Sequence, residues 1–457
     1  MLILLDLLVK KIYVNPKNAI GKFVHPLNPA INPSLSDILK IPIFYEFLSL
    51  ITQTYLFFKY IFEVKVRNIL RLTFFPLFFG LTTIPGMHNN IANVRYNMLY
   101  FYKIVPGNPL FFHINLTPKK ELCSPIVQNG ILYQGLADGT ILSQDIKNKR
   151  ILWEYHVVGQ PTSLIMSQEK IITTTLKGFI YVLDINNGNL IWSYNTHKEI
   201  ISKPVIDNNM LYLQTTLDTL YAFNISDGTL NWQYNEKNVY EGLLVHLTPS
   251  PYISNDVLYT GFSNGDAIAL NATNGQIIWL RKPPTTKQLQ DIIVRPVGNS
   301  QVVLFASYDN GIFCLNKKDG TLVWERNDLI RATALYISET AIYATFVNGM
   351  IYRLDLRTGD SIWKTNLGED PGLTPPELYN NKIILGVEKG KYKGLVLLDP
   401  FTGFVIGHFP IVSGVSAPPT IINNKIYAVS NGGFLYCFQS TTEDIKEGIS
   451  RNIFNFP

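Results

Sequence analysis

Six tryptophans recur at a nearly constant interval through the middle of this 457-residue chain. Consecutive members are 39, 40, 47, 45 and 39 residues apart: Trp153, Trp192, Trp232, Trp279, Trp324 and Trp363. A period of roughly 40 residues is typical of repeat architectures, so it constrains the fold before any single residue is considered. Each of the last five tryptophans ends the same pattern: Asp or Asn, two variable residues, Asp, Asn or Thr, Gly, three more residues, Trp.

The pattern before each tryptophan predicts a tight turn. The leading Asp or Asn can accept hydrogen bonds from the backbone two residues on, and the glycine four residues after it can take the left-handed conformation that closes a hairpin. The glycines at this position are Gly188, Gly228, Gly275, Gly320, Gly359 and Gly403. One strand follows the turn and three precede it, as in residues 202–214, so each unit is predicted to be four short strands.

Four-stranded antiparallel units of this length, when repeated, form the blades of a β-propeller, and the large indole suits the space between two blades. Two degenerate copies extend the count. Residues 145–153 have Lys149 in place of the glycine, and residues 399–407 have Gly407 in place of the tryptophan. An eighth copy runs from residue 416 to 438 and lacks its last strand.

The missing strand must come from elsewhere in the chain, because a propeller ring has to be closed. We expect the apolar run Pro109–Leu116 to supply it. The fold predicted is therefore all-β: an eight-bladed β-propeller of four-stranded antiparallel blades over residues 108–440. A hydrophobic and helical region, residues 1–107, precedes it, and a tail, residues 441–457, follows.

The region before the propeller carries two segments typical of membrane proteins. Residues 41–64 are almost wholly apolar and long enough to span a bilayer, although three charged residues interrupt them. In residues 65–86, three basic residues precede the uncharged run 72–85, which is the order of an export signal. We expect membrane association through this region, by a cleaved signal or a retained anchor; the alternative is two hydrophobic helices that pack on each other.

The formal net charge of +5 belongs to this region and not to the propeller. Residues 1–110 hold 11 Lys and Arg against 4 Asp and Glu, which leaves 28 against 30 for the rest of the chain. A propeller that binds nucleic acid would carry a basic stripe of its own, so no nucleic-acid partner is expected.

The repeat resembles the pyrroloquinoline-quinone (PQQ) type of propeller repeat, and eight such copies in an exported chain resemble the outer-membrane assembly factor BamB family. The resemblance covers roughly residues 108–440. It implies a non-catalytic scaffold without cofactor, at the periplasmic face of the outer membrane or otherwise membrane-anchored. It also implies a partner, the barrel-inserting protein BamA or one like it, and a role in assembling and inserting β-barrel proteins. No cysteine follows residues 72–85 at the place of a lipidation signal.

The same resemblance implies where the partner binds. In the family, an Asp-containing loop between the fourth and fifth blades meets a Leu-Arg turn that enters the fourth. Residues 288–293 are similar to the first loop, and residues 241–246 occupy the second position without the arginine. The partner-binding candidates are Leu243, Leu244, Leu289 and Asp291. The two longest intervals between tryptophans fall at these loops.

Two other functions remain open at this point. A membrane-tethered propeller could bind an unknown partner, or the chain could be a PQQ-dependent quinoprotein dehydrogenase, which needs a base and a Ca²⁺ site and often uses adjacent cysteines. Cys123, Cys314 and Cys437 are far apart and the histidines share no ligand spacing, so we expect no catalytic residue, metal or disulfide.

Overall fold

The computed structural model describes residues 96–103, 120–236, 247–282 and 289–440. They belong to the second of the two units into which the chain divides, residues 91–457. In this part of the chain no helix is long and apolar enough to cross a membrane. The predicted N-terminal segments 41–64 and 65–86 and the C-terminal tail lie outside the described residues.

The described residues form eight sheets, each of four antiparallel strands, as predicted. Blades 1 and 2 contain β2 (Ile126–Gln128), β3 (Ile131–Gly135), β4 (Thr140–Asp145), β5 (Ile151–His156), β6 (Pro161–Ser167), β7 (Lys170–Thr175), β8 (Phe179–Asp184) and β9 (Leu190–Asn195). Blades 3 and 4 contain β10 (Val205–Asp207), β11 (Met210–Gln214), β12 (Thr219–Asn224), β13 (Leu230–Asn235), β14 (Tyr252–Ser254), β15 (Val257–Gly261), β16 (Ala267–Asn271) and β17 (Ile277–Arg281). Blades 5 and 6 contain β18 (Val297–Gly298), β19 (Val302–Ser307), β20 (Gly311–Asn316), β21 (Leu322–Arg326), β22 (Ala332–Ile337), β23 (Ala341–Phe346), β24 (Met350–Asp355) and β25 (Ser361–Asn366). Blades 7 and 8 contain β26 (Glu377–Tyr379), β27 (Lys382–Val387), β28 (Gly394–Leu398), β29 (Val405–Pro410), β30 (Thr420–Ile422), β31 (Lys425–Val429), β32 (Phe434–Ser440) and β1 (Tyr96–Lys103).

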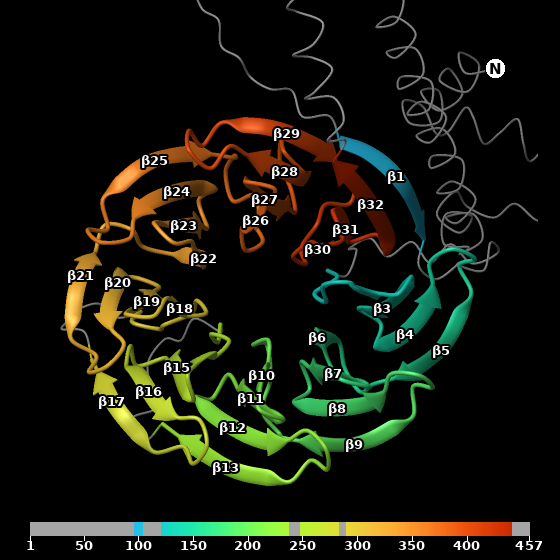
Figure 1. Ribbon diagram of the computed structural model, residues 1–457, viewed down its shortest axis with the longest axis horizontal. Helices are drawn as coiled ribbons and strands as arrows, with labels where there is room; N and C mark the ends of the chain where they lie inside the picture. The colour runs from blue at the N-terminus through green and yellow to red at the C-terminus, as the bar shows by residue number, and fades with distance from the viewer. Residues whose placement is uncertain (1–95, 104–119, 237–246, 283–288, 441–457) are drawn as a thin grey trace, which may run out of the picture. The chain divides into compact units, whose positions relative to one another are not determined.

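The sheets stand in a ring, with the first strand of each blade innermost and the last outermost (Figure 1). We call these strands A to D from the axis outward. The A–B and C–D turns then lie on one rim of the ring, which we call the turn rim. The B–C loops and the D–A connections between blades lie on the other, which we call the loop rim.

The ring is closed by a strand from the N-terminal side of the propeller. In blade 8, β1 takes the outer position and pairs antiparallel with β32, with Tyr100 opposite Cys437. A strand before the first complete unit does close the last blade, but it is not the predicted run 109–116, which lies outside the described residues. Both segments are apolar and precede the first unit, so hydrophobicity could not choose between them. The pairing register selects the earlier one.

The tryptophans join neighbouring blades, and the turn glycine is the reason they fit. The indole of Trp232 donates a hydrogen bond to the carbonyl of Ala272 in the next blade at 2.8 Å. A Cβ atom on Gly275, in that same turn, would lie 2.8 Å from Cδ2 of the indole. The same arrangement occurs six times: Trp153 on Gly188, Trp192 on Gly228, Trp232 on Gly275, Trp279 on Gly320, Trp324 on Gly359 and Trp363 on Gly403.

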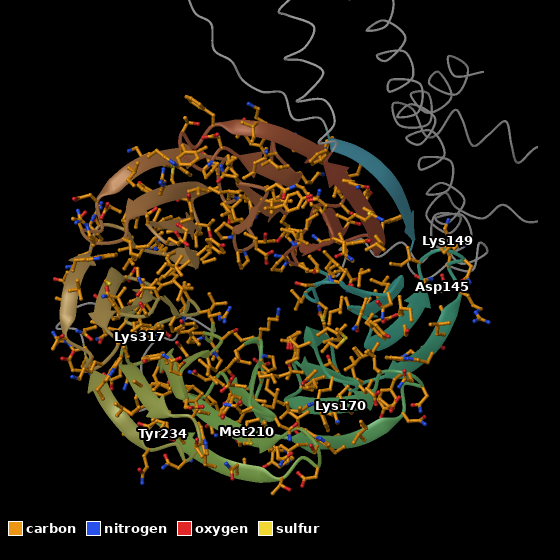
Figure 2. All side chains as sticks on the ribbon, viewed as in Figure 1. Asp145, Lys149, Lys170, Met210, Tyr234 and Lys317 are labelled. Atoms are coloured by element: carbon orange, nitrogen blue, oxygen red, sulfur yellow. The ribbon has the colours of Figure 1, made fainter. Side chains whose placement is uncertain are left out.

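Ring closure explains why two copies of the repeat are degenerate. The tryptophan of each blade packs on the C–D turn of the next, but blade 8 has no such turn, because its D strand comes from the other end of the propeller. Gly407 therefore stands where a tryptophan would have nothing to contact. In the ring, the C–D turn of blade 1 lies next to the D strand of blade 8, which is β1. Because β1 contains no tryptophan to pack on this turn, Lys149 can replace glycine there, with a φ of 60°. Figure 2 shows Lys149 and Asp145 in that turn.

The core lies between the blades. Around blades 2 and 3, for example, Ile172 and Val182 pack with Leu213 and Phe223 in one buried cluster. The three cysteines are buried and unbridged, as expected from their separation.

Candidate functional site

Apart from the connection from β1 to β2, the two longest D–A connections start and end on the loop rim. They contain residues 237–246, between β13 and β14, and residues 283–288, between β17 and β18; both segments lie outside the described residues. The candidates Leu243 and Leu244 fall in the first. The next described residue, Leu247, is 52% exposed, and Leu217 in the B–C loop of blade 3 is 50% exposed. Large apolar side chains are therefore exposed on this rim beside the first connection.

The candidates of the second connection are less accessible than the sequence suggests. Leu289 is half-buried and Asp291 is only 2% exposed. The carbonyl of Asp291 accepts a hydrogen bond from the Tyr308 amide at 2.8 Å, and the next residue, Ile292, donates from its amide to Phe262 at 3.1 Å. These bonds tie the connection to blades 5 and 4 as it returns from the outer edge to the axis. The structure therefore places Asp291 as a buried residue of this connection and not as an exposed charge.

Three more acidic side chains are buried on the loop rim close to these connections: Asp218, Glu236 and Asp266. The carboxylate of Asp218 accepts hydrogen bonds from the amide and the hydroxyl of Ser263, which joins blade 3 to blade 4. The Tyr234 hydroxyl donates to Glu236 at 3.1 Å. Sequence reasoning missed this group, because each acid stands in an ordinary loop and only the fold brings them together.

Two of these acids, Asp218 and Asp266, have a raised pKa. Burial raises the pKa of Asp218 to about 6; the hydrogen bonds from Ser263 oppose the shift, and the carboxylates of Asp291 and Glu236 add to it. Burial also raises the pKa of Asp266, with the Lys282 ammonium opposing. This part of the loop rim is thus acidic, and Asp218 takes up a proton in mildly acidic solution.

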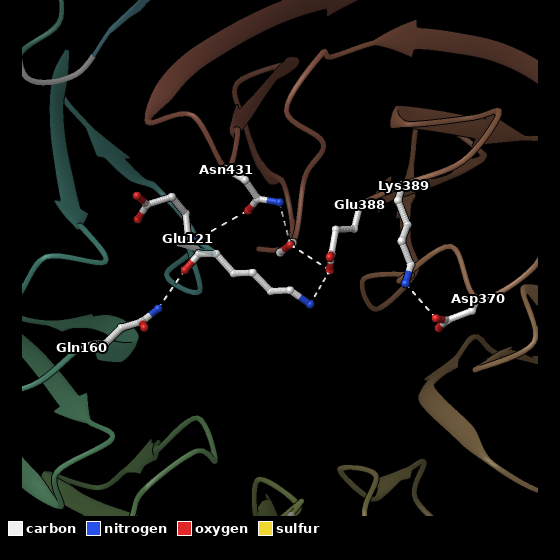
Figure 3. Close-up of polar contacts among 8 residues, drawn as sticks. Glu121, Gln160, Asp370, Glu388, Lys389 and Asn431 are labelled. Carbon is white, nitrogen blue, oxygen red and sulfur yellow. Dashed lines mark hydrogen bonds and ion pairs between the residues drawn. The ribbon is translucent and has the colours of Figure 1, made fainter. Parts of the chain in front are cut away.

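A second polar group lies on the loop rim where the ring closes (Figure 3). The Lys120 ammonium and the Glu388 carboxylate, from the B–C loop of blade 7, form an ion pair at 2.8 Å. The amide of Glu121 donates to Asn431 in blade 8 at 3.2 Å, and Gln160 donates to the Lys120 carbonyl at 2.7 Å. Lys120 and Glu121, which precede blade 1 in the chain, are thereby bonded to blades 2, 7 and 8. These contacts hold the ring closed in addition to the pairing of β1 with β32.

A third group lies at the start of the inner strands. Lys203 of blade 3 is exposed, yet the surrounding protein desolvates its ammonium group in part and so lowers its pKa; the Arg295 guanidinium of blade 5 lowers it further, and Glu377 of blade 7 opposes both. These blades are not neighbours, so their charges interact across the axis of the ring.

The described residues offer no arrangement for metal or thiol chemistry. No three His, Cys, Asp or Glu side chains among them are placed to hold a metal ion. Burial raises the pKa of the Cys314 thiol to about 12, which keeps it protonated and unreactive near neutral pH. What the structure does provide is a rim of loops with exposed apolar side chains, the kind of surface that binds other proteins.

Comparison with known proteins gives a consistent family. The model of the family described as "Outer membrane protein assembly factor BamB" matches residues 163–365 and 293–455. A protein of that name from Legionella pneumophila is 27% identical over 199 residues, which are 42% of this chain and 51% of that protein. The Burkholderia pseudomallei protein is 22% identical over 326 residues, 69% of this chain and 84% of its own length. The first of these matches thus spans about half the length of the relative.

Solved structures share the fold. BamB from Moraxella catarrhalis aligns with a TM-score of 0.62 and 18% identity, over 76% of this chain and 100% of that one. A quinohemoprotein alcohol dehydrogenase from Comamonas testosteroni aligns with a TM-score of 0.57 and 12% identity, over 77% of both chains. At these identities the likeness concerns the fold alone.

Proposed function

This chain belongs to the family of the outer membrane protein assembly factor BamB, and from that premise we propose that it is a non-catalytic propeller scaffold that assists the assembly and insertion of β-barrel proteins into the outer membrane. The observation that carries the proposal is the family match, which extends from blade 2 to blade 8. The likeness to the quinohemoprotein dehydrogenase rests on the fold alone and supports no enzymatic activity for this chain.

The proposed partner is a BamA-like outer-membrane barrel protein, and the proposed contact is the loop rim around blades 3 to 5. Leu243, Leu244 and Leu289 are the contact candidates from the sequence, and the exposed Leu217 and Leu247 extend them. An interface of this kind needs apolar side chains at its centre, which these leucines supply. Asp291 is left out of the contact because it is buried.

The proposed location is the periplasmic face of the outer membrane, with residues 41–64 and 65–86 providing export and membrane association. The support is the apolar composition of these segments and their order of charges.

Recovery of a BamA-like barrel protein with the full exported chain tests the partner. We expect Leu244→Ser and Leu247→Ser to reduce the recovery. The thermal midpoint of Leu247→Ser should stay nearly unchanged, because the Leu247 side chain is exposed and such side chains contribute little to stability. Leu190→Ser is the matched control, since Leu190 is an exposed leucine on the outer strand of blade 2, away from the loop rim. Failure of the wild type to recover such a barrel, or full recovery by both variants, would contradict the proposal.

A further inference from the structure

The C–D turn of blade 7 exposes aromatic side chains where the other C–D turns of the repeat have polar residues. Its second and fifth residues after the leading Asp399 are Phe401 and Phe404, which are 61% and 70% exposed. The other six turns have polar residues at both places: Lys147, Asn186, Ser226, Thr273, Lys318 and Arg357, and then Arg150, Asn189, Thr229, Gln276, Thr321 and Asp360. Comparison of the C–D turns with one another therefore shows that only the turn of blade 7 exposes two aromatic rings.

The turn does not need these rings for its structure. The Asp399 carboxylate accepts hydrogen bonds from the amides of Phe401 and Thr402 at 2.9 and 2.8 Å, as the leading acids do in other turns. Gly403 has a φ of 74°, like the other turn glycines. The Arg353 guanidinium of blade 6 lies over the Phe401 ring at 5.4 Å from its centroid, but the backbone contacts of the turn are met as in the polar turns. The turn therefore does not require aromatic side chains, and their exposed faces can serve binding.

The same rim is where the N-terminal region enters the propeller. Strand β32 is the C strand of blade 8, so its end at Ser440 lies on the turn rim, as does the end of β28 before the blade 7 turn. Tyr96, the first residue of β1, pairs with Ser440. The N-terminal end of β1, Tyr96, therefore lies on the turn rim, in the blade next to Phe401 and Phe404.

The neighbouring turns on this rim carry basic side chains. Lys382 begins the B strand of blade 7, Lys425 begins that of blade 8, and three more basic residues, Lys147, Lys149 and Arg150, occupy the turn of blade 1. The turns adjoin. The side-chain amide of Asn380 donates to the side-chain oxygen of Asn424 at 2.9 Å, and Ile146 and Ile422 pack against the same buried cluster. The acids of the same turns, Asp399 and Asp145, accept backbone hydrogen bonds within them.

We propose that this sector of the turn rim, the side of blades 7, 8 and 1, rests on the surface of an anionic phospholipid bilayer, with Phe401 and Phe404 entering the interface and the basic side chains facing the head groups. The inference rests on the proposed membrane association of the N-terminal region. If residues 72–85 are held in a bilayer, residues 86–95 can separate Tyr96 from it by about 40 Å at most, so the rim that carries Tyr96 is the one near the lipid.

A bilayer fits this sector better than a protein partner does. The rings stand in a turn that Arg353 and Lys382 adjoin, and further basic side chains lie in the turns of blades 8 and 1 along the same rim. Aromatic side chains are favoured at membrane interfaces, and each basic residue near an anionic surface contributes about 1 kcal/mol, roughly fivefold in binding. A protein contact needs a surrounding surface that excludes water from the rings.

A fluorescent label tests the placement in the full chain. The three native cysteines are buried, so a Cys introduced on the surface can be labelled selectively with the polarity-sensitive dye NBD. Phe404→Cys tests the sector. Gln276→Cys carries the label at the same turn position of blade 4, and Val412→Cys carries it on the loop rim of blade 7. We expect a blue shift of the emission on phosphatidylglycerol vesicles for the label at 404 and not for the two controls.

Two changes sharpen the test. In the 404-labelled chain, Lys147→Gln, Lys149→Gln and Arg150→Gln together should reduce the blue shift, and added salt should reduce it as well. Vesicles of phosphatidylcholine alone should give a smaller shift than anionic vesicles.

A label at 404 that stays in water while the chain sediments with the vesicles would overturn the inference and leave the membrane association standing. Loss of sedimentation itself would overturn both. A label that is shielded only by a solubilised barrel protein, without lipid, would assign the sector to that protein instead.

Discussion

At the scale of single residues, each tryptophan packs on the turn glycine of the next blade, a contact that we call the tryptophan socket. Two separate features of this contact require glycine. The backbone is left-handed there, and the indole occupies the space of a Cβ atom. At Gly275 the φ is 72° and the nearest indole atom lies 2.8 Å from where a Cβ would be. The glycine can therefore be recognised from the sequence as a turn residue, but its packing role appears only in the structure.

We expect Gly275→Ala to lower the free energy of unfolding by about 3 kcal/mol, because left-handed backbone and overpacking each cost 1–3 kcal/mol. The matched control is Gly130→Ala in the A–B turn of blade 1, where the φ is 77° and a Cβ atom would meet nothing within 4 Å. Urea unfolding of both variants separates the two features. Equal losses in the two variants would show that the indole contact adds nothing.

The buried acid Asp218 predicts a pH dependence. Its pKa of about 6 lies above the ordinary 3.8, so the folded state holds the proton more tightly than the unfolded state. The free energy of unfolding from this group therefore falls as the pH rises from about 4 to 6, by on the order of 3 kcal/mol. Asp218→Asn, which can still accept from Ser263, should remove this fall.

Denaturant unfolding of wild type and Asp218→Asn at several pH values measures the difference. Asp227→Asn is the control of opposite sign, since hydrogen bonds from Thr229 hold the pKa of Asp227 below its ordinary value and its contribution is lost only as the pH falls. Parallel stability curves for wild type and Asp218→Asn would exclude a raised pKa in the folded state.

At the scale of elements, the turns and strands follow from local chemistry, and the closing strand does not. The turn of blade 2 forms because the Asp184 carboxylate accepts from the amides of Asn186 and Asn187, all within four residues of sequence. The pairing of β1 with β32 joins residues more than 330 positions apart. Two apolar segments could fill that place, and the sequence alone favoured the wrong one.

A disulfide can test the register of this closure. Tyr100 lies opposite Cys437, and directly opposed residues of antiparallel strands have Cα atoms close enough for a disulfide. We expect Tyr100→Cys to form a bond with Cys437 on mild oxidation, detected by peptide mapping without reductant. Phe101→Cys, which lies opposite Tyr436, should not. A bond from Ile114→Cys instead would return the closing position to residues 109–116.

At the scale of the whole molecule, the two proposed surfaces lie on opposite rims. The leucines near blades 3 to 5 are on the loop rim, and the two phenylalanines of blade 7 are on the turn rim. A protein partner and a membrane could then be bound at the same time. The blades between them are held by inter-blade clusters and tryptophan sockets, and sites this far apart act independently in most proteins.

We therefore expect a double dissociation. Leu247→Ser should lower recovery of the barrel protein without changing the vesicle response of a label at residue 404. The double variant Phe401→Ser with Phe404→Ser should abolish the salt-sensitive part of sedimentation with vesicles, which is the part that we assign to this rim. Its recovery of the barrel protein in detergent should be unchanged. If either variant affects both measurements, the two rims are not independent.

The sequence was enough to predict the propeller, its eight four-stranded blades and the places of the six tryptophans, because hairpin turns depend on hydrogen bonds a few residues apart and the repeat shows the same local solution many times. It could not locate the closing strand or the burial of Asp291, because both depend on which distant segments meet. The same is true of the acids around Asp218 and of Phe401 and Phe404 beside the entry of the chain. Ring closure brings residues from opposite ends of the propeller together, and contacts of that range leave no mark on the local pattern of residues.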